Sequence, residues 1–162
     1  MDIKVNGRIC SLKYSKKRDQ YENSTKSCVG YIRDNNFLGF SYDICMYKVY
    51  KLGDKNYVFK NETKYSNTTS KHSYEIYELI KHLYADNIER SFSVTNIAFS
   101  CEYTIKNSVE YYEKQNEELL SLINKKGTRK KTNEDRKEKI EQNKKTIEVL
   151  TELKKEAAIK FD

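Results

Sequence analysis

The sequence of 162 residues contains no proline, and its apolar residues never form a run long enough to cross a membrane. Its N-terminal stretch lacks the apolar segment that directs secretion. Without proline there is also no proline-rich linker to separate domains. We therefore expect a cytoplasmic protein, made in a reducing compartment, with no membrane partner.

The four cysteines contain no Cys-x-x-Cys pair, and this excludes the ligand spacing of a zinc ribbon. In a reducing compartment we expect them to serve as small apolar core residues. The alternative, if an export signal had been removed, is that they form two disulfides. The four positions are Cys10, Cys28, Cys45 and Cys101.

Glycine is scarce, and the five glycines form neither a P-loop nor the Gly-x-Gly-x-x-Gly fingerprint of a dinucleotide site. Gly30, Gly39 and Gly53 instead occupy separate strand and turn contexts. The sequence therefore disfavours nucleotide hydrolysis.

Only two histidines are present, His72 and His82, ten residues apart on one predicted helix. That separation is about three helical turns, too far for both to bind one metal ion. We interpret both as structural or solvent-facing, because no local sequence brings His82 to a cysteine nucleophile. Glu75 and Glu78 are interpreted as a solvated helix face. We therefore expect no catalytic residue, no metal and no cofactor, and a protein that is not an enzyme.

What the chain does have is tyrosine and charge. Fourteen tyrosines and six phenylalanines argue against disorder, although 34% of the residues are charged. This composition predicts a small core inside a heavily charged shell. Because a tyrosine ring packs while its hydroxyl seeks a partner, tyrosine-rich cores and tyrosine-rich contact surfaces look alike in a sequence.

Alternating apolar residues predict strands through the first half of the chain. Asn6-Gly7 is typical of a two-residue hairpin turn, and the polar stretch 15–26 is expected to be a loop. A second loop is expected over 61–70. The expected strands after the hairpin turn cover 8–14, 27–33, 37–52, 57–60 and 92–105.

The periodicity changes to that of a helix from Ser73, and Asn87 is expected to stop this helix. Its apolar stripe consists of Ile76, Tyr77, Ile80, Leu83 and Tyr84. The fold class is therefore α+β: an antiparallel sheet of about five to six strands with one packed helix over residues 1–106, followed by an antiparallel, coiled-coil-like helical hairpin over 107–162.

The hairpin is predicted from apolar residues spaced three and four apart on both sides of a basic break. A reversal between Lys125 and Thr132 sets every seam residue against a partner in one common register. Two asparagines then share a layer, and a buried asparagine pair fixes one alignment over its slipped alternatives. The alternative is that both asparagines face solvent, and the same seam could serve a homodimer. The predicted seam is Tyr112, Asn116, Leu119, Ile140, Asn143 and Ile147.

Two further residues mark the expected ends of these helices. Gly127 suits the left-handed residue that follows a helix. Thr132 suits the start of the next helix, because its hydroxyl can accept a free backbone amide and acidic residues follow it.

The net charge of +7 is unevenly spread, and two basic clusters account for the excess. Such clusters can bind phosphates by releasing counterions, and the alternative is that they are only solvated. Tyr14 and Tyr21 flank the first cluster, as aromatic rings do in single-strand binders, with local stacking as the alternative. The candidate contact residues are Lys16, Lys17 and Arg18 in the segment 13–18, and Lys125, Lys126, Arg129, Lys130 and Lys131 in 125–131.

In size, charge and lack of catalytic motifs, the whole chain resembles the small proteins of phages and mobile elements, including anti-CRISPR inhibitors of host defence nucleases. That resemblance implies a non-enzymatic interaction protein that binds and blocks a host protein or nucleoprotein complex, in the host cytoplasm if a phage encodes it. The alternative is a protein that binds DNA or RNA directly through its two basic clusters.

Overall fold

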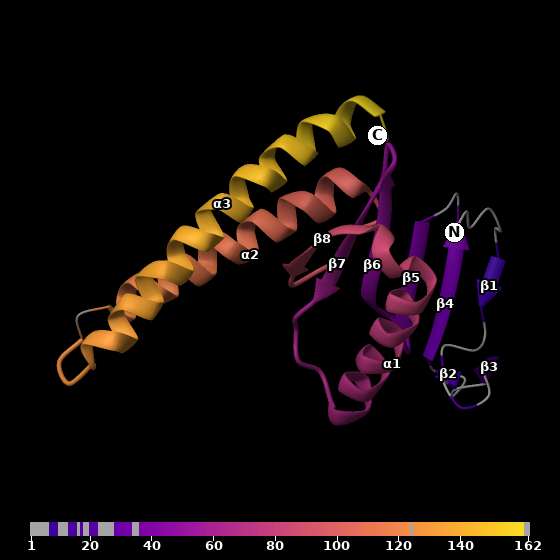
Figure 1. The fold of residues 1–162 in the computed structure, drawn as a ribbon, viewed down its shortest axis with the longest axis horizontal. Coiled ribbons are helices and arrows are strands. Elements are labelled where there is room, and N and C mark those ends of the chain that lie inside the picture. The colour runs from indigo at the N-terminus through magenta and orange to yellow at the C-terminus, as the bar shows by residue number, and fades with distance from the viewer. Residues whose placement is uncertain are drawn as a thin grey trace. The chain divides into compact units, whose positions relative to one another are not determined.

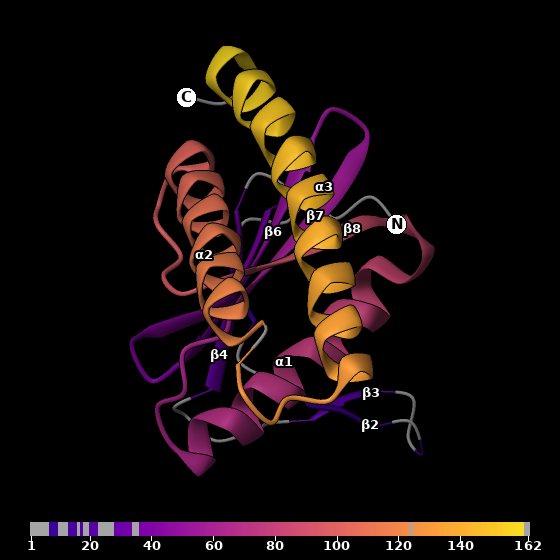
Figure 2. The same cartoon turned by 90° about the vertical axis from the view of Figure 1, so that its left-hand side faces the viewer.

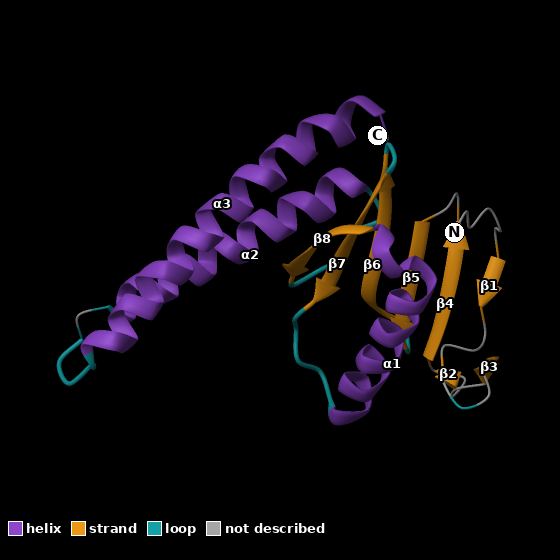
Figure 3. Ribbon diagram, in the orientation of Figure 1, coloured by secondary structure: helices purple, strands orange, loops and turns teal. Residues whose placement is uncertain are grey.

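The computed structural model describes residues 7–9, 13–15, 17, 20–22, 28–33, 36–123 and 125–160. The chain divides into two compact units, Met1–Ile97 and Ala98–Asp162. We call the first the sheet unit and the second the hairpin unit. The structure confirms the α+β class: a sheet and one helix precede two long helices (Figures 1 and 3).

The main sheet has six strands in the order β1-β4-β5-β6-β7-β8, and β2 pairs with β3 in a separate two-stranded ladder. Neighbours from β1 to β7 are antiparallel, as predicted, whereas β8 runs parallel to β7. A parallel neighbour needs a crossover connection, which the helix between β7 and β8 provides. The strands are β1 (Gly7–Ile9), β2 (Lys13–Ser15), β3 (Gln20–Glu22), β4 (Cys28–Arg33), β5 (Asn36–Ser41), β6 (Ile44–Leu52), β7 (Lys55–Asn61) and β8 (Ile88–Val94).

The single strand expected over 37–52 is wrong, because the chain reverses at Tyr42 and Asp43 to form β5 and β6. Tyr42 has a φ of 55°, a left-handed conformation that a bulky residue seldom adopts. Asp43 is a turn-forming residue, but no glycine or asparagine accompanies it and the apolar alternation continues across the turn, which hides the reversal. Asp34 and Asn35, which separate the expected strands 27–33 and 37–52, and Asn6 of the expected hairpin turn lie outside the described residues.

Helix α1 (Asn67–Tyr84) begins inside the segment expected to be a loop. The Ser66 hydroxyl accepts a hydrogen bond from the Thr69 amide at 3.1 Å and so caps the helix start. A short 3₁₀ turn, η1 (Ala85–Asn87), follows the helix, close to the stop expected at Asn87.

The core of the sheet unit lies between α1 and one face of the sheet. The predicted stripe is buried at Ile76, Ile80, Leu83 and Tyr84, whereas Tyr77 is 38% exposed. The helix approaches the sheet closely at Gly39, where an added Cβ would lie only 2.6 Å from Ile76 Cγ2. The cluster also contains the buried sheet residues Cys28, Ile32, Phe37, Met46, Tyr47, Val49 and Val58.

The opposite face of the sheet carries aromatic rings. Phe59 and Phe92 lie side by side on β7 and β8, with ring centroids 5.3 Å apart. Tyr50 meets Phe59 edge-on, and Tyr57 stacks on Phe92. The central strands therefore carry apolar residues on both faces.

The hairpin unit consists of α2 (Cys101–Leu122) and α3 (Lys130–Lys160), which lie side by side along their lengths (Figure 2). The last strand expected over 92–105 is therefore wrong beyond Val94. Ser100 explains the difference, because its hydroxyl accepts from the Tyr103 amide at 3.0 Å and starts a helix there. The hairpin helices thus begin before residue 107.

Candidate functional site

The hairpin is held in register by a buried polar layer. Asn143 Nδ2 donates to Asn116 Oδ1 at 2.9 Å and to Gln115 Oε1 at 2.8 Å. Asn116 is 9% exposed and Asn143 only 1%. The structure therefore places this pair as the predicted register requires, and rejects the alternative in which both face solvent. Gln115 was missed, because nothing in its spacing distinguishes it from other polar residues of α2.

Most of the other residues of the predicted seam are only partly buried. Ile140 is buried, whereas Tyr112, Leu119 and Ile147 are half-buried. Leu150, which the same register places opposite Val109, is fully buried. The seam is thus narrow, and its alignment depends on the asparagine layer more than on a wide apolar contact.

The second basic cluster occupies the connection between α2 and the first turn of α3. Among the described residues none of its five cations makes an ion pair, and all five are exposed. No acidic residue lies between 123 and 131. We call this surface the hairpin tip, defined as Lys125, Lys126, Arg129, Lys130 and Lys131.

The start of α3 differs from the prediction. The Arg129 carbonyl accepts the first helical hydrogen bond, from the Asn133 amide at 3.2 Å, so the helix starts at Lys130 and not at Thr132. No acidic residue lies in the first turn. Lys130 and Lys131 therefore sit at the positive end of the helix, where cations are unfavourable. The predicted cap failed because Thr132 falls within this turn.

Two other residues shape the connection. Gly127 has a φ of 86°, the left-handed conformation predicted for it, although it lies beyond the end of α2 at Leu122. Arg136 Nη1 donates to the Leu122 carbonyl at 2.9 Å and so ties the start of α3 to the end of α2. Sequence reasoning missed Arg136, because a capping cation so far along the chain has no local signal.

The first basic cluster is described only in part. Lys17 is exposed in a turn between β2 and β3, whereas Lys16 and Arg18 lie outside the described residues. The hairpin tip is the basic cluster whose residues the structure describes in full.

His72 and Glu78, two of the residues weighed as catalytic candidates, make contacts within the fold. Ser41 Oγ lies 2.8 Å from His72 Nδ1, and Ser41 also donates to Thr69 Oγ1. All three side chains are buried, so the network fastens β5 to α1 away from solvent. Glu78 forms an ion pair with Lys81 at 2.6 Å. Among the described residues, no three potential metal ligands gather in one place.

The described cysteines are free thiols. Cys28 and Cys101 are buried, and Cys10 lies outside the described residues. Burial raises the pKa of Cys45 to about 11, a shift that Lys48 only partly opposes. A thiol with such a pKa is protonated at neutral pH, which is the opposite of an activated nucleophile.

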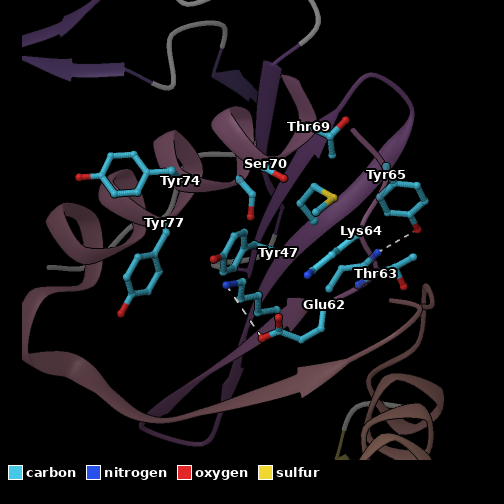
Figure 4. Close-up of a pocket in the computed structure, with 13 residues that line it drawn as sticks. Tyr47, Glu62, Thr63, Lys64, Tyr65, Thr69, Ser70, Tyr74 and Tyr77 are labelled. Carbon is cyan, nitrogen blue, oxygen red and sulfur yellow. Dashed lines mark hydrogen bonds and ion pairs between the residues drawn. The ribbon is translucent and has the colours of Figure 1, made fainter. Parts of the chain in front are cut away.

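A third surface, missed from the sequence, is a pocket in the sheet unit with a cavity of about 270 Å³. It lies between β6, the segment that follows β7 and the first three turns of α1 (Figure 4). Most of its residues lie between Lys60 and Tyr77, but they come from a strand end, a loop and a helix and form no recognisable motif. We call it the tyrosine pocket and define it by Tyr47, Lys60, Lys64, Tyr65, Tyr74 and Tyr77.

No protein-family model, curated protein or solved structure matches this chain. None of the helices in the described part of the chain combines the length and apolarity needed to cross a membrane. The hairpin tip and the tyrosine pocket are the two candidate sites in the described part of the chain.

Proposed function

We propose that this protein is a non-enzymatic binding protein whose hairpin tip engages the phosphates of a nucleic-acid-containing host partner. The observation that carries the proposal is the charge of the tip: five exposed cations, with no acidic residue between 123 and 131 to neutralise them. Each phosphate that such cations neutralise releases counterions, which favours binding at low and moderate salt.

The placement of Lys130 and Lys131 supports this assignment. Cations in the first turn of a helix oppose its macrodipole and weaken it. Two other lysines of α3 are paired with acids of the same helix, Lys144 with Glu141 at 3.3 Å and Lys155 with Glu152 at 3.4 Å. An arrangement that lowers stability at one point of a regular element is typical of a binding surface.

The hairpin also holds the tip in one geometry. The hydrogen bonds of Asn143 fix the alignment of α2 and α3, and Arg136 joins their adjacent ends. A rigid tip loses little conformational freedom on binding, so more of the electrostatic attraction remains as affinity. Occupation of the partner by the hairpin would block it, as an inhibitor of a host defence nuclease does.

The first experiment tests whether nucleic acid alone suffices. Binding of a labelled single-stranded DNA or RNA is measured by fluorescence anisotropy over a range of NaCl concentrations. If the tip contacts phosphates directly, the double variant Lys130→Glu, Lys131→Glu should bind more weakly, and the magnitude of its salt slope should fall by about 1.4. The matched control, Lys139→Glu with Lys145→Glu, changes the same charge on exposed positions of α3 outside the tip.

The control decides whether the tip is a site. An equal loss of affinity in both double variants would mean that only net charge matters, and the tip assignment would fail. An absence of binding to every oligonucleotide at low salt would exclude direct binding and leave a nucleoprotein or an acidic protein as the partner.

The second experiment is a pulldown from the native host. We expect a stoichiometric complex with the wild-type chain that is lost with the tip variant and retained with the control. Loss of the complex on Leu119→Ala would show that the hairpin seam is also required. Recovery of self-associated chain alone would overturn the proposal and assign the hairpin to homodimerisation.

A further inference from the structure

We propose that the tyrosine pocket binds a nucleoside monophosphate, with the base against the exposed ring of Tyr65 and the phosphate at Lys64. This site lies wholly within the sheet unit and does not depend on the function proposed for the hairpin tip. Its cavity of about 270 Å³ is close to the lower end of the range for small-molecule sites.

The wall of the pocket is pre-organised by contacts among its own side chains. Tyr47 and Tyr77 stack with centroids 5.9 Å apart and ring planes at 19°. Lys81 Nζ lies 4.9 Å from the centre of the Tyr77 ring. Tyr47 is buried and hydrogen-bonded to Ser73, and burial raises its pKa to about 12, so its hydroxyl stays protonated. These two rings form a fixed wall.

Two other rings remain accessible. Tyr65 is 47% exposed and Tyr74 is 66% exposed. The Tyr65 hydroxyl accepts a hydrogen bond from Asn61 Nδ2 at 3.4 Å, which holds the ring in place. An exposed tyrosine ring that is already positioned offers a flat apolar face to a base, and stacking of this kind is tolerant of base identity.

The charges of the pocket favour an anion. Lys60 Nζ lies 3.9 Å from Glu62 Oε1, and the same Glu62 oxygen accepts from Ser93. The negative charge of Glu62 is thus already engaged. Lys64 is exposed, and among the described residues it makes no ion pair. Figure 4 shows Lys64 between Tyr65 and Tyr47, so the unengaged cation and the accessible ring are neighbours.

An extended peptide is a poorer occupant than a nucleotide. Peptides commonly bind beside a sheet by adding a strand to a free edge. β6 and β7, which contribute residues to the pocket, each have a neighbouring strand on both sides. No strand edge is free there, and the remaining recognition chemistry consists of rings, hydroxyls and a cation.

The test is a titration of the full-length protein with adenosine 5′-monophosphate, followed by amide NMR spectra and isothermal calorimetry. We expect one site per chain, with shift changes confined to residues 46–47 and 60–77. Adenosine and inorganic phosphate, added separately, should each bind at least about tenfold more weakly than the nucleotide, because each supplies only half of the recognition. Phosphate binding as tightly as the nucleotide would overturn the role assigned to the rings.

Substitutions distinguish this site from general charge. Lys64→Ala and Tyr65→Ala change exposed side chains, so the fold should be retained, and each should weaken binding about fivefold or more. Lys71→Ala, an exposed lysine of α1 outside the pocket, is the matched control and should change nothing. Equal losses at Lys64 and Lys71, or no shift changes on titration, would refute the proposal.

The same titration separates this proposal from the function assigned to the hairpin tip. Nucleotide binding should be unaffected by Lys130→Glu with Lys131→Glu, because those residues belong to the hairpin unit. A loss of nucleotide binding in that variant would place the nucleotide at the tip and overturn the pocket assignment.

Discussion

The sheet unit and the hairpin unit bury different chemistry at their centres. Phe37, Ile76 and Val49 are fully buried between α1 and the sheet. The middle of the hairpin instead contains the hydrogen-bonded pair Asn116 and Asn143. Apolar burial supplies most of the free energy of folding, whereas a buried polar pair mainly selects one alignment. The sheet unit is thus built for stability, and the hairpin for a defined presentation of its tip.

The largest expected effect tests the core of the sheet unit. Ile76→Ala should lower the free energy of unfolding by about 2 to 5 kcal/mol, because it removes a fully buried side chain and leaves a cavity. Ile147→Ala in the half-buried hairpin seam is the matched control and should cost less. Urea unfolding followed by circular dichroism and tyrosine fluorescence measures both.

An equal cost for these two substitutions would contradict the contrast between the units. It would mean that the hairpin seam contributes as much apolar burial as the core beneath α1.

The next effect concerns the polar layer. Asn143→Ala should cost about 1 to 3 kcal/mol, because Asn116 and Gln115 lose their buried donor. Gln142→Ala, one residue earlier and exposed, should be nearly neutral. Chemical denaturation provides the comparison, and equal costs at 142 and 143 would show that the layer does not stabilise the hairpin.

Replacing both asparagines sharpens the same point. Asn116→Leu with Asn143→Leu should not lower stability, because an apolar pair of similar size needs no buried hydrogen bond. The expected loss is of a single alignment, seen as doubled or broadened amide NMR signals from α2 and α3. One sharp set of signals would mean that the register is fixed elsewhere.

The sequence was sufficient for the hairpin alignment and insufficient for its ends. The register follows from spacing alone, because the four seam pairs 109/150, 112/147, 116/143 and 119/140 share one constant sum of positions. The ends depend on caps, which involve one or two residues and compete with nearby patterns. The alternation after Phe92 suggested a strand to 105, yet the Ser100 hydroxyl starts α2 within it.

The remaining misses have physical causes of the same kind. Apart from Asp43, the turn at Tyr42 has no favourable turn residue, and the pairing of β5 with β6 holds Tyr42 in its left-handed conformation. The parallel pairing of β8 depends on the length of the crossover through α1 and not on any residue of β8. The tyrosine pocket assembles residues 46–47, 60–65 and 69–77, which only the folded sheet unit brings together.

Alkaline pH should weaken the sheet unit through groups whose pKa burial raises, among them Cys45, Tyr47 and Tyr84. Burial raises the pKa of Cys45 from 9.0 to about 11 and that of Tyr47 from 10.0 to about 12. The folded state therefore keeps protons that the unfolded state has lost. This contribution is fully present below pH 9 and is lost as the pH rises through about 11 and then 12.

The measurement is the free energy of unfolding between pH 8 and 11. In the Cys45→Ala variant the free energy of unfolding should fall less steeply above pH 9 than in the wild type, because the variant lacks the Cys45 thiol. An unchanged slope in that variant would show that Cys45 does not contribute to the alkaline loss.

The smallest expected change in stability bears most directly on function. Lys130→Glu with Lys131→Glu places anions at the positive end of α3 and should raise the stability of the hairpin by about 0.3 to 1 kcal/mol per site at low salt. The control pair should change the stability of the hairpin in the opposite direction. Lys139→Glu and Lys145→Glu lose attractive spacings to Asp135 and Glu141 and should be slightly destabilising.

Thermal unfolding at low and high salt, beside the binding assay, tests this opposition. The tip variant should unfold at a higher temperature while it binds its partner more weakly, and its gain in stability should shrink in high salt. A protein that gains stability from losing its tip cations must retain those cations for another reason, and partner binding is the reason proposed here. A tip variant that is both less stable and weaker in binding would make the lost affinity a consequence of unfolding, and the tip would no longer be assigned as the contact surface.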